Sequence, residues 1–574
     1  MEFEPALEAL SKRFGRFHLV TLSLICMTYV FQALFYLSYV FTTLRSDHRC
    51  HIPECDQELS EMAPSWLPMA VPLADGLPDP CRRFVALPGI DGDSCTAEAF
   101  SNLTQECTQW VYPNKELSIM TEWDLTPCAS GGDWQVTLVG TMNNIGRVLG
   151  LPLSGYLSDR YGRKTILLAS LAVSGVIGIA RSVSPSYMFF IVLEFIDPMF
   201  YDGMGSSALV MGMEVLPSSA RGAWSVASHV VFALGQALLG AVAWALPYWR
   251  WLLRALYSSA LLTLPLLWLF LPESMRWLVS KGRVRDAQNI LRKAAKMNRS
   301  ESTCQINFDK VELSGVTKES DGSADEKPDI STELMALLRS RILAFRLFNC
   351  CFAWVAIMFV YDGLSINSVT MAGNRYLNFI LVVLIEIPGA LVTAKMMTLF
   401  GRRLSLSGSF ILAAFCCFAF HFLPADVPWP RTAAVLLAKL CVTISFTVIY
   451  VLSTELFPTS VRATLFATCA TMGRMGSVLA PQTPQLGRLL DALPMLVFGG
   501  AAMVSGLLAL TFPDMGDEAL PDTIAEAEAL GRKSMRRRKT SSVAPAPAPA
   551  PALTQTQTPV EVALTIPEAF VTHL

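Results

Sequence analysis

The sequence predicts an all-α membrane protein of about twelve transmembrane helices, arranged as two six-helix repeats. Hydrophobic residues make up 52% of the 574 residues, charged residues only 16%, and the mean hydropathy is +0.43. This composition is too apolar for a soluble protein of this length. Short charged boxes also recur in the same order about 240 residues apart, with apolar sequence between them. The duplication favours a membrane carrier built from two copies of one unit.

Apolar runs of about 20 residues, the length that crosses a hydrocarbon core, define the spans. We place them at 17–43, 134–157, 165–184, 187–213, 223–246, 251–271, 343–365, 376–397, 405–423, 432–454, 464–483 and 490–512. The chain then divides into an N-terminal segment (1–16), a first half (17–271), a central loop (272–342), a second half (343–512) and a tail (513–574).

Basic residues indicate the orientation, because Lys and Arg in short loops stay cytoplasmic. They precede the first span and follow the second and fourth, and the second half repeats the arrangement: Lys12, Arg13, Arg16, Arg160, Arg163, Lys164, Arg221, Arg402, Arg403 and Arg462. These residues share one side if both termini are cytoplasmic. The first 16 residues lack the apolar region of a signal peptide, so we expect a retained first span in a multi-pass protein of the plasma membrane.

The loop between the first two spans (44–133) is rich in cysteine. It holds six of the chain's 14 cysteines: Cys50, Cys55, Cys81, Cys95, Cys107 and Cys128. An even cluster in one loop outside the membrane predicts an extracellular disulfide framework, although sequence alone cannot choose among the roughly 15 possible pairings. Asn102-Leu103-Thr104 in the same loop is a glycosylation acceptor pattern, which agrees with an external location.

The central loop and the tail are polar. Residues 281–296 have apolar positions at helical spacing, which predicts a short amphipathic helix at the inner membrane surface, and residues 301–329 resemble a flexible segment. The basic run 532–539 is typical of a solvated cytoplasmic tail, or of one that contacts anionic lipid. The last three residues, 572–574, could bind a scaffold protein by adding to a sheet edge.

The repeated boxes carry acids and bases at fixed spacing. GYLSDRYGRK (155–164) partly returns at 400–403, MEVLPSSAR (213–221) returns as TELFPTSVR (454–462), and 271–273 returns at 512–514. Their charges fall at the inner membrane surface: Asp159, Arg160, Arg163, Glu214, Arg221, Arg402, Glu455 and Arg462. We interpret them as gating latches that hold the two halves together in one state; the alternative is that they are only topology signals and turn residues.

The second copy of the first box is incomplete. Thr398 stands at the place of Asp159, and Leu399 stands at the place of Arg160. We therefore expect the stronger latch in the first half.

Nine segments in order resemble the organic cation, carnitine and organic anion transporters of the major facilitator superfamily, from about residue 17 to 525. They are DHRCHIPE (47–54), CTQWVY followed by EWDL (107–125), GYLSDRYGRK, LPESMRWLVSKGR (271–283), YDGLSIN (361–367), IEIPGAL (385–391), FGRR (400–403), TELFPTSVR and GRMGSVLAP (473–481). The resemblance implies a major facilitator fold with a cysteine-rich, glycosylated outer loop, a cytoplasmic helical loop and alternating access by rocking of the halves.

The resemblance also places a substrate-charge determinant at Arg474 in span 11, a position that is acidic in typical cation carriers and basic in anion and carnitine carriers. An arginine there offers a fixed fork for a carboxylate. The alternative is a structural pair with an acid such as Glu386 or Asp362. Glu386 matches an acid of the family's span 8 and precedes Pro388, where the helix backbone is freed. The second FGRR box lacks the family's Asp, which puts details of coupling in doubt.

Ionisable residues inside spans are costly, so each is a candidate for function. Asp362 lies beside Tyr361 in span 7, two helical turns from Trp354. A carboxylate next to aromatic faces suits an organic ammonium, although both aromatics could simply be packing residues. Further aromatic candidates are Tyr36, Trp224 and Phe232.

Spans 2 and 4 carry Arg147 and three acids, Glu194, Asp197 and Asp202. We interpret them as a buried pairing that holds the two spans together; a role for a proton or a substrate is the alternative.

These residues lead to the hypothesis of a transporter of small organic cations or carnitine-like zwitterions, in which Arg474 binds a carboxylate and Asp362 or Glu386 binds an ammonium group. Organic anion transport is the alternative, and a receptor or scaffold of transporter shape is a different class. The sequence lacks a phosphate-binding loop, an HExxH or GxSxG motif and zinc-spaced Cys/His sets, so we expect no ATP-driven motor, no enzyme, no metal and no cofactor. Nor do we expect a nucleic-acid partner: the partners are the bilayer and the small organic ion.

Overall fold

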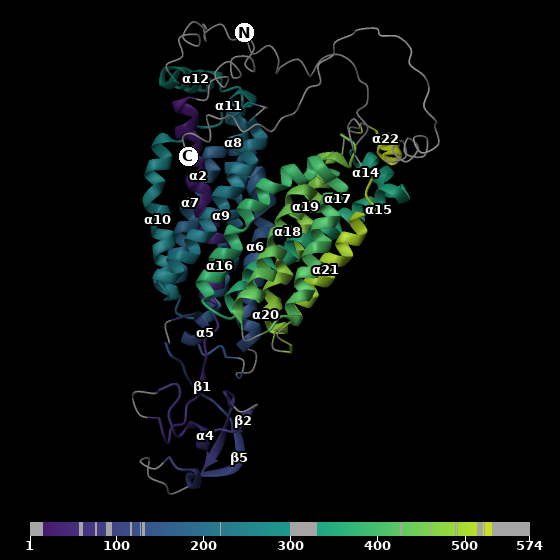
Figure 1. Cartoon of the computed structure of the whole chain (residues 1–574). Coiled ribbons are helices and arrows are strands. Elements are labelled where there is room, and N and C mark those ends of the chain that lie inside the picture. The colour runs from purple at the N-terminus through teal and green to yellow at the C-terminus, as the bar shows by residue number, and fades with distance from the viewer. Residues whose placement is uncertain are drawn as a thin grey trace, which may run out of the picture.

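A computed structural model of the chain describes residues 15–56, 61–74, 77–87, 95–114, 117–126, 128, 132–217, 220–298, 330–424, 427–459, 461–487, 489–490, 492–513, 521 and 523–530. The segment expected to be flexible (301–329), the basic run (532–539) and the last three residues (572–574) lie outside the described residues. The described helices form two bundles that lie side by side, with a small domain rich in short strands at one end of the first bundle (Figure 1).

The first bundle contains the helices of residues 16–270. They are α2 (Arg16–Tyr36), α3 (Ser38–Thr42), α6 (Gly132–Tyr161), α7 (Arg163–Ser182), α8 (Tyr187–Val215), α9 (Arg221–Ala245) and α10 (Trp249–Phe270). α2 and α3 are separated at Leu37, whose φ of −116° and ψ of 17° lie outside the helical region.

The second bundle contains the helices of residues 341–509. They are α15 (Arg341–Asn367), η4 (Ser368–Thr370), α16 (Arg375–Leu384), α17 (Glu386–Phe422), α18 (Pro428–Glu455), α19 (Arg462–Leu479), η5 (Ala480–Gln482), α20 (Thr483–Leu486) and α21 (Leu493–Ala509). α16 ends two residues before Glu386, close to the proline at 388 that the sequence analysis singled out.

By length and apolar composition, seven segments of the described chain could cross a membrane. One of them, Arg375–Phe422, covers two predicted spans, because α17 continues through a kink. The other four predicted spans coincide with α6, α8, α19 and the shorter apolar helix α21. α6 and α8 each carry charged residues within their length, which lowers their mean hydropathy. The fold is nonetheless all-α, as expected.

The duplication is visible in the backbone. Gly162 separates α6 from α7 with a φ of 109°, and Gly401 forms the kink of α17 with a φ of 74°. Residues with a side chain rarely adopt a positive backbone φ, so both copies of the box need glycine at the same place.

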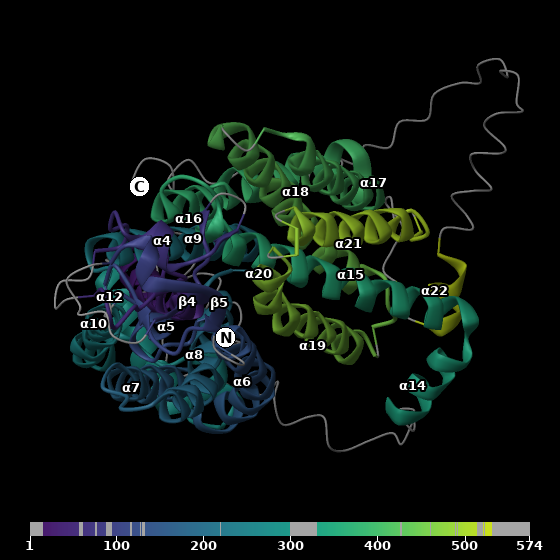
Figure 2. The same cartoon turned by 90° about the horizontal axis from the view of Figure 1, so that it is seen from below.

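The two bundles meet near the face that carries the strand-rich domain. Phe41 at the end of α3 packs against Phe379 of α16 with ring centroids 5.0 Å apart. The amide nitrogen of Gln485 in α20 donates to the Thr137 hydroxyl of α6 at 2.7 Å. Toward the opposite face, where α12 and α14 lie, the bundles diverge (Figure 1). Seen along the bundle, α9 and α16 are neighbours at the boundary between the halves (Figure 2).

The described residues between 44 and 128 form the strand-rich loop domain. Three antiparallel pairs occur: β1 (Arg49–Cys50) with β6 (Trp110–Val111), β2 (Leu73–Ala74) with β3 (Leu77–Pro78), and β4 (Arg82–Ala86) with β5 (Phe100–Glu106). Two short helices, α4 (Leu67–Ala70) and α5 (Ile119–Glu122), and the turn η1 (Ala97–Ala99) complete it.

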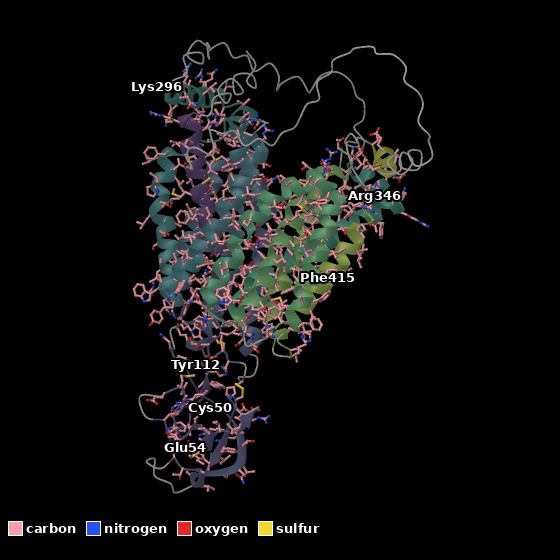
Figure 3. The ribbon with its side chains drawn as sticks, viewed as in Figure 1. Cys50, Glu54, Tyr112, Lys296, Arg346 and Phe415 are labelled. Carbon is pink, nitrogen blue, oxygen red and sulfur yellow. A yellow bond between two sulfur atoms is a disulfide. The ribbon has the colours of Figure 1, made fainter. Side chains whose placement is uncertain are left out.

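Disulfides join the six cysteines of this loop as Cys50–Cys107, Cys55–Cys95 and Cys81–Cys128. The sequence predicted a disulfide framework here but left the pairing open; Figure 3 labels Cys50 in this domain. Asn102 lies on β5 and is exposed.

Short helices cover the opposite face. α11 (Met275–Ser280) and α12 (Val284–Asn298) follow the first bundle, and α12 overlaps the predicted amphipathic segment. Its apolar side packs on Phe17 and Met275. α14 (Ile330–Arg339) and α22 (Ile524–Ala529) belong to the second bundle, where the Arg346 guanidinium donates to the carbonyl of Ala527 at 2.6 Å and of Leu530 at 3.1 Å.

Candidate functional site

Three polar contacts connect the two halves between their ends. The Tyr36 hydroxyl of α2 donates to Oδ1 of Asp362 in α15 at 3.0 Å. Arg474 of α19 pairs with Asp202 of α8 at 3.3 Å. These four side chains come from segments that are far apart in the chain, and each pair contains one residue of each half. Their position at the boundary makes them sensitive to any movement of one half against the other.

The third contact joins His229 of α9 to Glu386 of α17, with Nε2 3.7 Å from Oε2. Glu386 is fully buried, whereas the His229 side chain is 21% exposed. The contact is an ion pair only when the imidazole is protonated.

Arg147 of α6 occupies the centre of this region. Its guanidinium lies 3.9 Å from the centroid of the Tyr36 ring, a cation–π contact. Nη1 donates to Oδ1 of Asn144 at 2.8 Å, and Nε lies 3.7 Å from Asp202. The predicted pairing of spans 2 and 4 therefore involves Asp202, while the other two acids of span 4 serve a separate network.

Asp202 is shared by two arginines, one from each half. For Arg474, the sequence analysis considered Glu386 or Asp362 as structural partners; the structure instead pairs it with Asp202. The Arg474 side chain is 18% exposed, compared with 2% for Arg147. Of the two cations, Arg474 is therefore the more accessible to a ligand.

Asp362 is almost completely buried, with 1% exposure. Its Oδ1 accepts from Tyr36, whereas Oδ2 has no hydrogen-bond partner among the described residues. A buried carboxylate oxygen without a partner is costly, so this atom would gain from a donor supplied by a ligand. Phe232 packs edge-on against Tyr36, with ring centroids 5.4 Å apart, so aromatic rings border the site.

Tyr361 points to a different acid. Its hydroxyl donates to Glu386 at 2.5 Å, and its ring lies 3.2 Å from Nζ of Lys439 in α18. Lys439 also pairs with Glu386 at 2.9 Å and donates to the Ser365 hydroxyl at 2.8 Å. Glu386 is thus neutralised within its own half.

The sequence analysis missed Lys439. A lysine within an apolar span of α18 is itself the signal, because an ionisable residue in a span needs a partner or a function.

The two predicted tryptophans lie away from Asp362. Nε1 of Trp354 donates to the Ser453 hydroxyl at 2.9 Å, and its ring packs against Tyr450 at 4.7 Å. Trp224 packs against Tyr29 at 6.2 Å and is 3% exposed. Both side chains serve packing in this conformation.

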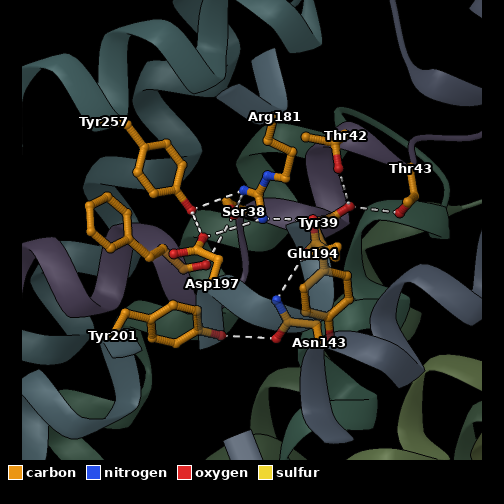
Figure 4. Close-up of polar contacts among 11 residues, drawn as sticks. Ser38, Tyr39, Thr42, Thr43, Asn143, Arg181, Glu194, Asp197, Tyr201 and Tyr257 are labelled. Carbon is orange, nitrogen blue, oxygen red and sulfur yellow. Dashed lines mark hydrogen bonds and ion pairs between the residues drawn. The ribbon is translucent and has the colours of Figure 1, made fainter. Parts of the chain in front are cut away.

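A second buried network lies wholly within the first half (Figure 4). Arg181 of α7 pairs with Glu194 at 2.6 Å and with Asp197 at 3.4 Å. The Tyr257 hydroxyl of α10 donates to Asp197 at 2.6 Å, and the Asn143 amide of α6 donates to Glu194 at 2.7 Å. All three charged side chains are fully buried, and the described partners of this network come from helices of the first bundle.

The sequence analysis did not single out Arg181, which lies within the predicted span 165–184, in the last turn of α7.

The gating candidates pair within their own half in this conformation. Arg163 pairs with Asp159 at 2.8 Å and approaches Glu214 at 3.5 Å. In the second half, Arg402 pairs with Glu455 at 3.1 Å.

The remaining gating residues contact their own turns. Arg160 donates to the Tyr156 hydroxyl at 3.1 Å, and Nε of Arg462 donates to the Phe457 carbonyl at 3.1 Å. Arg221 lies at the first residue of α9. The charges are therefore gathered at the face where the bundles diverge.

Glu273, from the third repeated box, supports the first turn of α7. Its Oε1 accepts from the backbone N–H of Lys164 at 2.9 Å, and Nε1 of Trp277 donates to the carbonyl of Asp159 at 2.9 Å. A carboxylate at a helix N-terminus is favourable, because the free N–H groups there carry partial positive charge.

Known proteins are similar to this chain in sequence and in fold. Residues 118–481 match the family model of the Major Facilitator Superfamily. The chain is 30% identical over 525 residues to the organic cation transporter protein of Drosophila melanogaster, which covers 91% of this chain and 93% of that protein. It is 32% identical over 523 residues to the human organic cation/carnitine transporter 2, covering 88% of this chain and 90% of that protein.

Among solved structures, the xylose transporter XylE of E. coli in an inward-open conformation shares the fold, with a TM-score of 0.53 and 17% identity over 72% of this chain and 92% of that one. The chain therefore belongs to the Major Facilitator Superfamily, as a multi-pass membrane transporter homologous to the organic cation and carnitine transporters and to other members of solute carrier family 22.

Proposed function

We propose that this transporter carries small organic ammonium ions, including zwitterions that also bear a carboxylate. The observation that supports this most is the boundary between the halves, where one carboxylate oxygen of Asp362 has no hydrogen-bond partner within the described part of the chain and the other accepts from Tyr36. An ammonium group placed there would satisfy the carboxylate and lie against an aromatic face. The relatives named for organic cations and carnitine agree with this substrate class.

Arg474 is the proposed contact for a carboxylate. It shares Asp202 with Arg147, so two guanidinium groups compete for a single acid. A substrate carboxylate would supply the second acid, and the guanidinium fork can bind it through two parallel hydrogen bonds.

We propose alternating access as the mechanism. The halves touch near the loop domain through Phe41 and Phe379, and Gln485 and Thr137, while the gating residues pair within their own halves at the opposite face. In the other state, the contacts near the loop domain would open and the gating boxes of the two halves would approach each other. The three central contacts would break and form again each time the protein changes between the two states.

The loop domain is proposed to lie outside the cell, with both termini in the cytoplasm, in the plasma membrane. Three disulfides favour an oxidising compartment, and Asn102 is exposed for glycosylation. The basic boxes then lie on the cytoplasmic side, as the distribution of Lys and Arg requires.

The test is uptake in cells that express the protein at the surface, with a panel of simple organic cations, carnitine-like zwitterions and dicarboxylates. We expect saturable uptake of cations or zwitterions and exchange of internal for external substrate. Asp362→Asn should lower kcat/KM for ammonium substrates about tenfold or more, because a charged hydrogen bond is lost. Arg474→Asp should abolish zwitterion uptake and retain or improve uptake of simple cations.

Arg82→Gln, at an exposed residue of the loop domain, is the matched control and should leave uptake unchanged. Unaltered selectivity in Arg474→Asp would remove Arg474 from the site. Binding without accumulation or exchange would favour the receptor alternative.

Organic anion transport is the second candidate, since Arg474 is more exposed than Asp362. Dicarboxylate uptake that survives Asp362→Asn and is lost in Arg474→Gln would establish it.

A further inference from the structure

A cavity of about 670 Å³ lies between the halves on the side of the loop domain. The first half contributes the chain after α3 and the start of α6, including Arg45 and Thr137, and the second half contributes Asn367, Arg375 and Arg431. Its volume is typical of sites for small molecules. Among the described residues that line it, neither Asp362 nor Arg474 occurs, so it is distinct from the central site.

The cavity is positively charged. Three arginines line it, and no aspartate or glutamate is among the described lining residues. Arg45 lies 3.7 Å from Asp133, and burial lowers the pKa of Arg45.

The other two arginines contact neutral groups. Nη1 of Arg375 donates to the carbonyl of Arg45 at 3.1 Å, and Nε of Arg431 donates to the carbonyl of Leu423 at 3.2 Å. The Arg431 guanidinium also lies 5.1 Å from the centroid of the Phe420 ring. A backbone carbonyl or a ring orients a guanidinium without cancelling its charge, so an anion can still be bound.

The rest of the wall is amphipathic. Phe420, Ile366 and Met495 offer apolar surface, while Asn367 and Thr137 offer an amide and a hydroxyl. Such a wall fits an organic anion with an apolar body better than it fits inorganic phosphate.

We propose that this cavity binds an aromatic or aliphatic carboxylate, and that the bound anion holds the halves together on the side of the loop domain. Arg45 belongs to the first half, and Arg375 and Arg431 belong to the second, so one carboxylate bridges both. A ligand that contacts both halves binds best when they are closed here, and it shifts the population toward that state. The anion is thus an inhibitor of turnover at a site separate from the substrate site.

Binding is tested first, because it does not depend on transport. The purified full-length protein in lipid nanodiscs is titrated with 1-naphthoate, and its thermal unfolding is followed. The neutral analogue 1-naphthamide is the ligand control. We expect 1-naphthoate to raise the unfolding temperature with a saturable dose dependence, and 1-naphthamide to have no effect.

Arg375→Gln and Arg431→Gln should each weaken the apparent affinity for 1-naphthoate about tenfold, because each removes a charged hydrogen-bond donor. Arg82→Gln, an exposed arginine of the loop domain outside the cavity, is the protein control and should bind as wild type does. Equal affinity in both cavity variants and wild type would overturn the proposal, as would equal binding of 1-naphthamide.

A second experiment measures transport, and its interpretation rests on the proposed alternating access. With an ammonium substrate, 1-naphthoate should lower the maximal rate and leave KM unchanged, and Arg375→Gln should relieve the inhibition. Competitive inhibition that persists in Arg375→Gln and disappears in Arg474→Gln would place the anion in the central site instead. If no substrate accumulates at all, the proposed function fails, whereas the thermal titration still decides on the cavity.

Discussion

The two halves repeat the same charged boxes, yet they use their buried charges differently. In the first half, Arg181 and two acids form a network that is fully buried within the bundle. In the second half, Lys439 and Glu386 form a buried pair that extends to His229 of the other half. The comparison suggests that the Arg181 network holds helices of the first half together, whereas the Lys439–Glu386 pair also reaches the boundary between the halves through His229.

The difference also appears at the opposite face. Arg163 contacts two acids, Asp159 and Glu214, whereas Arg402 contacts Glu455. Thr398 and Leu399 stand where the second copy lacks its acid and base. The second box therefore differs from the first in its residues, and a stronger latch in the first half stays a prediction.

The largest expected effect is a loss of folded protein, and it should differ between the two buried networks. Arg181→Gln leaves two carboxylates buried without their cation, which should cost about 3–5 kcal/mol and prevent recovery of folded protein. Lys439→Gln leaves a single acid, and the His229 imidazole beside it can become protonated and replace the lost charge. The protein should therefore fold, while substrate uptake falls about tenfold. Size-exclusion profiles of fluorescent fusions measure folding, and uptake per surface-expressed molecule measures function.

The double variant Lys439→Gln/Glu386→Gln is the control for the uncompensated charge and should fold as well as wild type. If Arg181→Gln folds normally and Lys439→Gln does not, the proposed difference between the Arg181 network and the Lys439–Glu386 pair is wrong.

A smaller effect is expected at the gating boxes. Arg163→Gln removes the contacts with Asp159 and Glu214, and Arg402→Gln removes the pair with Glu455, at roughly 0.2–1 kcal/mol per pair. Turnover should change about fivefold in Arg163→Gln and about twofold in Arg402→Gln, because the second box has no counterparts of Asp159 and Arg160. The exchange rate in proteoliposomes measures turnover, with binding affinity as the control that should stay constant. Equal effects of the two variants would mean that the latch is symmetrical despite the sequence.

The smallest effect concerns the loop domain, which only the first half carries. Burial alone would raise the pKa of Asp56, but hydrogen bonds from Arg49 and from the N–H of Ile52 lower it below its ordinary value. A lowered folded-state pKa contributes stability above the ordinary value of about 4, and this stability is lost as the pH falls below it. The tryptophan fluorescence of Trp66, which packs on Arg49 at 5.3 Å, reports the change.

Asp56→Asn should remove this acid sensitivity, whereas Glu54→Gln, at a more exposed acid, should not. A fluorescence transition at the same pH in wild type and Asp56→Asn would contradict the assignment.

Much of the fold could be predicted from the sequence, because membrane spans are set by composition and length. The boxes at Gly162 and Gly401 predicted the duplication, and both glycines adopt the same left-handed backbone. The cysteine count predicted a disulfide framework, but only the three-dimensional fold determines the partners.

The central site was predictable only in part. A charge within a span shows that a partner is needed, but it does not show which one. The partner of Arg474 is Asp202, on the opposite half, and Trp354 turns to Ser453 rather than toward Asp362. Such pairings depend on how the two bundles meet, and local sequence patterns do not contain that information.

The clasp of Arg346 on α22 has a mechanical consequence. Its guanidinium fastens the chain at Ala527 and Leu530 to the start of α15, so a load applied to the tail reaches the second bundle first. A protein bound to the tail would hold the second bundle in place, and the first bundle would then move relative to it during the proposed alternating access. The point at which the tail is attached therefore lies on the second bundle and not on the first.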